Sequence, residues 1–100
     1  MTQLDLPFST ICFHAGIVAT WDNAENFCDA NFRARFCSLG QWRTVVCRAG
    51  APNPGRSWLD DVVGAGSYAT VAGCTSDSVG VAPFNQAAIV GPCCLEFMKY

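Results

Sequence analysis

The chain has 100 residues, of which 51% are hydrophobic and 14% are charged, and its formal net charge is −2. This composition excludes a disordered chain, and the few scattered basic residues argue against nucleic-acid binding. The apolar segments are too short to span a membrane. We therefore expect a single domain over residues 1–100, with no nucleic-acid partner and no membrane span.

Seven cysteines are unusual in so short a chain, and no two of them have the CxxC spacing of a metal or redox site. Small domains often need covalent links, and disulfides persist in oxidising compartments. We therefore expect a disulfide-linked domain that is extracellular or exposed on a surface such as a virion or an appendage. Residues 1–8 lack the basic and apolar segments of a secretory signal peptide. The cysteines are Cys12, Cys28, Cys37, Cys47, Cys74, Cys93 and Cys94.

The first half of the chain changes from a strand pattern to a helical one. Residues 6–19 are apolar and β-branched, which predicts one or two short strands. Apolar residues then recur every three or four positions, so we expect a helix over residues 21–32, with Thr20 as its cap. A second helix is expected over residues 39–48, because Ser38 and Gln41 form a capping box ahead of another apolar stripe.

The second half has no helical period. The segment 51–55, with sequence APNPG, is a predicted turn or loop. Short strands are possible within YATVAG, SVGVAP and AAIVG, and the alternating sequence CCLEFMKY predicts a closing strand. The order of these elements predicts an α+β domain in which the two ends of the chain pair in one sheet.

Five segments, taken in order, resemble C-type lectin-like domains of a short, cysteine-rich microbial or viral type. TWDNAENFC resembles the start of their first helix, FCSLGQW the start of their second, and RSWLDD the tryptophan-containing segment that opens their long-loop region. GCTSDS and PCCLEF resemble their closing strands. The resemblance implies an α+β fold in which two helices flank a small antiparallel sheet, with a loop-rich face over residues 51–91.

The resemblance also implies a disulfide pattern. It pairs Cys28 of the first helix with Cys94 or Cys93 of the closing strand, and Cys74 with the other of these two. Adjacent strand residues point to opposite faces, so Cys93 and Cys94 need separate partners. Cys37 and Cys47 flank the second helix about 15 Å apart and cannot pair with each other. An odd number leaves one cysteine over, and Cys12 is expected to be a free thiol or a link to another chain.

We expect a binding or adhesion module that recognises a protein or a glycan without calcium, because the carboxylate loop of calcium-binding lectins is missing. Loops on a rigid scaffold commonly carry recognition. The alternative is a structural subunit that self-assembles with its own copies into an extracellular fibre, coat or appendage filament. The expected ligand-binding residues are Arg56, Trp58, Asp60, Asp61, Tyr68, Asp77 and Asn85.

We expect no enzymatic activity, no metal and no cofactor. A nucleophilic cysteine needs an adjacent imidazole, and His14, the one histidine in the chain, is interpreted as structural. Asp60 and Asp61 are adjacent carboxylates, but nothing in the sequence forms a pocket around them.

Overall fold

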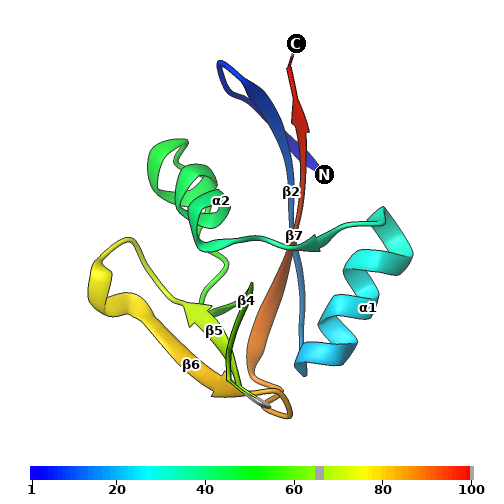
Figure 1. Cartoon of the computed structure of the whole chain (residues 1–100), viewed down its shortest axis with the longest axis vertical. Helices are drawn as coiled ribbons and strands as arrows, with labels where there is room; N and C mark the ends of the chain where they lie inside the picture. Colours follow the sequence, from blue (N-terminus) through cyan, green and yellow to red (C-terminus); the bar gives the residue numbers. More distant parts are fainter. Residues whose placement is uncertain (65–66, 100) are drawn as a thin grey trace.

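The computed structural model describes residues 1–64 and 67–99. Residues 65 and 66, in the expected loop-rich region, and residue 100, at the end of the expected closing strand, lie outside the described residues. The remaining chain folds around one mixed β-sheet with helical segments packed against it (Figure 1).

The sheet contains seven described strands in the order β1-β2-β7-β4-β5-β6, with the short β3 paired to β7. The expected pairing of the chain ends is confirmed, because β2 and β7 run antiparallel over most of their length. All other neighbours are antiparallel too, except that β4 meets β7 in parallel at Ser57 and Val90. The strands are β1 (Thr2–Asp5), β2 (Ser9–Ala19), β3 (Arg35–Phe36), β4 (Ser57–Gly64), β5 (Ser67–Val71), β6 (Val79–Pro83) and β7 (Ile89–Met98).

The two helices lie on opposite sides of the β2–β7 pair (Figure 1). Helix α1 (Trp21–Phe32) has the predicted bounds, although the Thr20 side chain makes no capping hydrogen bond. Helix α2 (Leu39–Arg43) begins with the predicted Ser38–Gln41 capping box. The second half of the predicted helix continues as a π-helical turn, η1 (Thr44–Arg48).

Each helix covers its own apolar core. One group of buried residues, which includes Trp58, Ile89 and Cys93, packs against α1. A second group, which includes Leu59 and Cys94, packs against α2 and η1. Successive residues of β4 and of β7 thus enter opposite cores, as the alternation of side chains along a strand requires.

Disulfides join both helical layers to adjacent residues of β7. Cys28 in α1 pairs with Cys93, which confirms one of the two expected partners of Cys28. The expected pairing of Cys74 with β7 is wrong, because Cys94 pairs with Cys37 at the start of α2. Cys74 instead pairs with Cys47 and ties η1 to the segment between β5 and β6.

Among the seven cysteines, all of which lie in the described residues, Cys12 remains as a half-buried free thiol on β2. It lies opposite Leu95, and the next residue on the same face of the strand is His14. The His14 ring packs against Phe27 and Phe32, and its Nδ1 accepts a hydrogen bond from the Gly16 amide. Three disulfides in one small domain indicate an oxidising environment.

The expected fold class is wrong. An α+β domain with two helices flanking a small antiparallel sheet was expected, but the structure is mostly sheet, with seven described strands, mixed directions and two short helices. The largest difference is in the region expected to be a loop-rich face. There β4, β5 and β6 pair as neighbouring antiparallel strands, with register shifts between β4 and β5. Trp58 and Leu59 on β4 are buried on opposite faces, which drives this segment into the sheet.

Gly16 and Gly91 allow the paired strands β2 and β7 to approach each other closely beside helix α1. The register of the two strands shifts between His14 and Ile17, where Gly16 adopts a positive φ of 74°. A Cβ added to Gly16 would lie 1.8 Å from the Gly91 carbonyl oxygen. A Cβ added to Gly91 would lie 2.4 Å from the Ala24 Cβ and 2.7 Å from a Phe36 ring carbon. Only residues without a side chain fit at these two positions.

We predict that Gly91→Ala destabilises the domain by about 1–3 kcal/mol, because the added methyl overpacks the contact between β7 and α1. The matched control is Gly40→Ala in α2, where the nearest atom to the added Cβ is 4.0 Å away. Alanine favours a helix, so the control keeps or raises stability. Urea unfolding measures both variants, and equal stabilities would contradict this packing.

Candidate functional site

The structure does not gather the predicted ligand-binding residues on one surface. Trp58 is fully buried and its Nε1 donates to the Ala19 carbonyl at 3.1 Å, so its assignment to a contact face is wrong. Asp77 and Asn85 are exposed but lie beyond opposite ends of β6. Asp61 is exposed on β4. The role of these exposed residues in binding stays a prediction.

The other three predicted residues are held by intramolecular contacts. The Arg56 guanidinium donates to Thr70 Oγ1 at 3.4 Å and to the Val81 carbonyl at 3.3 Å, and so links β5 to β6. The Tyr68 ring stacks on Trp21 with 4.2 Å between the ring centroids. The Asp60 carboxylate pairs with Arg35 at 3.4 Å. These contacts account for the three side chains without a ligand.

A carboxylate without a hydrogen-bond partner lies near this ion pair. Glu25 is on α1, and its buried Oε2 has no partner among the described residues. Burial raises the pKa of Glu25, Arg35 opposes the shift, and the nearby Asp60, Asp22 and Asp29 carboxylates add to it. A buried, unpaired carboxylate is unfavourable when ionised. The raised pKa means that ionisation of Glu25 is less favourable in the folded chain than in the unfolded chain.

We predict that Glu25→Gln raises the thermal midpoint at neutral pH. The raised pKa means that the folded state binds the Glu25 proton more tightly than the unfolded state does. The protonated group therefore contributes its full stability below the unfolded pKa, near 4.5. This contribution is lost as pH rises through the folded pKa. The increase in the thermal midpoint that Gln produces should therefore disappear in acid. Thermal unfolding from pH 3.5 to 7.5 measures the midpoint of this variant and of the control Glu96→Gln. A gain that persists unchanged in acid would contradict this account.

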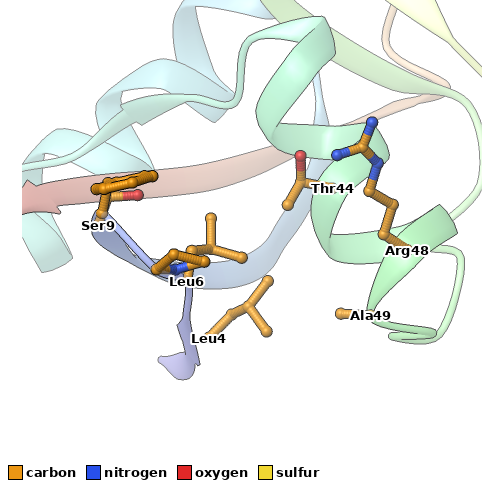
Figure 2. A pocket seen from close by; sticks show the side chains of 8 residues that line it. Leu4, Leu6, Ser9, Thr44, Arg48 and Ala49 are labelled. Atoms are coloured by element: carbon orange, nitrogen blue, oxygen red, sulfur yellow. The ribbon is translucent and has the colours of Figure 1, made fainter.

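An open apolar groove of about 460 Å³ lies on the other side of the sheet, where the β1–β2 hairpin faces η1 (Figure 2). The Phe8 ring at its edge is 78% exposed. Figure 2 shows Leu4, Leu6 and Ser9 on the strand side and Thr44, Arg48 and Ala49 on the helical side. The groove is lined by Leu4, Leu6, Pro7, Phe8, Ser9, Thr44, Arg48 and Ala49.

The strand wall of the groove is fixed by the end of the chain. The turn from Leu6 to Ser9 closes through a hydrogen bond from the Leu6 amide to the Ser9 carbonyl at 2.8 Å. Lys99, the residue after β7, holds this turn. Its amide donates to the Phe8 carbonyl at 2.8 Å and its Nζ donates to the Leu6 carbonyl at 2.9 Å. The backbone at Phe8 is therefore held by hydrogen bonds on the strand side of the groove.

The helical wall is held by its packing on the core and by a disulfide. Trp42 and Val45, on α2 and η1, are buried against the sheet. Cys47 on η1 is bridged to Cys74. η1 is a π-helical turn. Such turns are rare in proteins, and those that occur are often found at functional sites. Both walls of the groove are thus held by intramolecular contacts, and a pre-formed groove lowers the entropic cost of binding a ligand.

Sequence reasoning did not find this groove. Residues 6–8 fall in the segment 6–19 that is predicted to form strands, and Arg48 falls at the end of the predicted second helix. The adjacent apolar residues Leu6, Pro7 and Phe8 are a weak signal of an exposed hydrophobic turn. Nothing in the local sequence places η1 opposite this turn, because that placement depends on how β1, β2 and α2 pack on one another.

Two further features bear on function. Within residues 1–64 and 67–99, no group of three or more His, Cys, Asp or Glu side chains is arranged to hold a metal ion. Neither described helix has the length and apolar character needed to cross a bilayer.

Comparison with protein-family models and with curated proteins gave no match. The resemblance to C-type lectin-like domains therefore stays untested.

Proposed function

We propose that the chain is a calcium-independent binding and adhesion module that acts outside the cell or on an exposed surface and binds a protein partner. The apolar groove between the β1–β2 hairpin and η1 carries this proposal. A largely exposed aromatic ring beside apolar walls is typical of a protein-binding surface. A partner side chain that enters the groove would bury Leu4, Leu6 and Phe8 from water.

The composition of the groove favours a protein over a glycan. Sugars are bound through many hydrogen bonds from side chains, whereas most of the lining here is aliphatic or aromatic. The Thr44 hydroxyl already donates to the Gly40 carbonyl at 2.8 Å. Ser9 is nearly buried. Apolar side chains of a peptide segment are the ligand groups that match these walls.

We predict that peptides selected from a random display library on the oxidised protein lose about tenfold or more in affinity for Phe8→Glu. Burial of a phenylalanine ring is worth a change of this size. The matched control is Val18→Glu, which removes another exposed apolar residue, 65% exposed, from the far end of β2. Titration calorimetry compares the variants, and near-ultraviolet circular dichroism checks their folding. Peptides that bind both variants as well as the parent chain would contradict the groove.

A second candidate function is a structural subunit that self-assembles through its own copies. Two observations favour it. β1 and β6 are edge strands of the sheet, and Val79 and Val81 are exposed on β6. Exposed apolar edges are sites of strand pairing between chains, and Cys12 offers a thiol for a covalent link. Size-exclusion chromatography without reductant separates the two candidates, because a monomer at high concentration counts against assembly.

A further inference from the structure

We infer that the partner segment carries a carboxylate beside its apolar side chain, and that Arg48 binds this carboxylate. The inference rests on the proposed function of the groove and specifies its ligand. Arg48 is the charged residue in the lining, which contains no acidic side chain. Its guanidinium lies on the helical wall beside Thr44, one helical turn away (Figure 2).

The charge of Arg48 is not neutralised within the part of the chain that the structure describes. The ion pairs found there join Arg35 to Asp60 and Lys99 to Asp5. Two other acids lie near α2. Glu96 accepts a hydrogen bond from Gln41 Nε2 at 2.9 Å, and Asp77 bonds to the Thr75 hydroxyl next to the carbonyl that accepts from Arg43. Neither Asp5 nor Glu96 lines the groove. A cation at the rim of an apolar groove, without a counter-ion, favours a ligand of opposite charge.

The chemistry of the guanidinium identifies the anionic group. Its planar array of N–H donors binds a carboxylate through two parallel hydrogen bonds. When a ligand covers the groove, water is displaced and the ion pair becomes stronger than on an open surface. The neighbouring leucines and Phe8 bind apolar atoms. The complementary segment is therefore a peptide with Asp or Glu next to a bulky apolar residue.

A simpler role for Arg48 predicts a different result. A basic residue in the last turn of a helical segment interacts favourably with the helix dipole. If that were its only role, Arg48→Gln would change stability slightly and leave peptide affinity unchanged. The two roles are separated by measuring affinity and stability on the same variants.

The test uses the peptides from the display selection, synthesised with their acidic residue intact or replaced by its amide. We expect groove-dependent peptides, which lose affinity for Phe8→Glu, to be enriched in Asp or Glu. We expect Arg48→Gln to weaken their binding about tenfold, or about 1.4 kcal/mol, and to abolish the preference for acid over amide. The control Arg33→Gln removes an equal charge from the end of α1 and should leave affinity unchanged.

A charge reversal gives an independent readout. Arg48→Glu should bind the peptide in which lysine replaces the acid better than it binds the original peptide. If groove-dependent peptides bind Arg48→Gln as tightly as the parent chain, the inference is overturned while the proposed function stands. If no selected peptide depends on Phe8, both are overturned.

Discussion

The structure depends on a constraint at two adjacent residues of β7. Side chains of neighbouring strand residues point to opposite faces of a sheet, so Cys93 and Cys94 must bond to different layers. Cys93 reaches α1, and Cys94 reaches the segment that starts α2. Both links close loops of more than fifty residues. Long closed loops remove much entropy from the unfolded chain, and each is worth about 4 kcal/mol in the chain-entropy model.

This arrangement explains how a chain with little room for a core keeps two separate cores. Each side of β7 carries one disulfide to that strand, one helical layer and one buried tryptophan, Trp58 on the α1 side and Trp42 on the α2 side. The indole N–H groups of both tryptophans are satisfied within the protein. The resulting scaffold positions the β1–β2 hairpin against η1. The groove is therefore a product of the same packing that stabilises the fold.

Local signals predicted the elements better than their assembly. The apolar stripe of α1 and the capping box at Ser38 are encoded within one or two turns, and both were predicted correctly. The strand β4 was missed, because both of its faces are buried at Trp58 and Leu59. The segment therefore lacks the alternation of apolar and polar residues that indicates a strand. The partner of Cys74 was wrong because pairing depends on tertiary proximity, which spacing does not encode. The groove was missed for the same reason, since its walls lie about forty residues apart in sequence.

The central claim, that adjacent cysteines of β7 anchor opposite layers, is tested most directly by disulfide mapping of the oxidised protein. Tandem mass spectrometry with backbone fragmentation between residues 93 and 94 assigns each sulfur separately. The account predicts Cys28–Cys93, Cys37–Cys94 and Cys47–Cys74, with Cys12 open to alkylation. Exchange of the partners of Cys93 and Cys94, or a bridge from either to Cys74, would place the helical layers on the wrong faces and contradict the account.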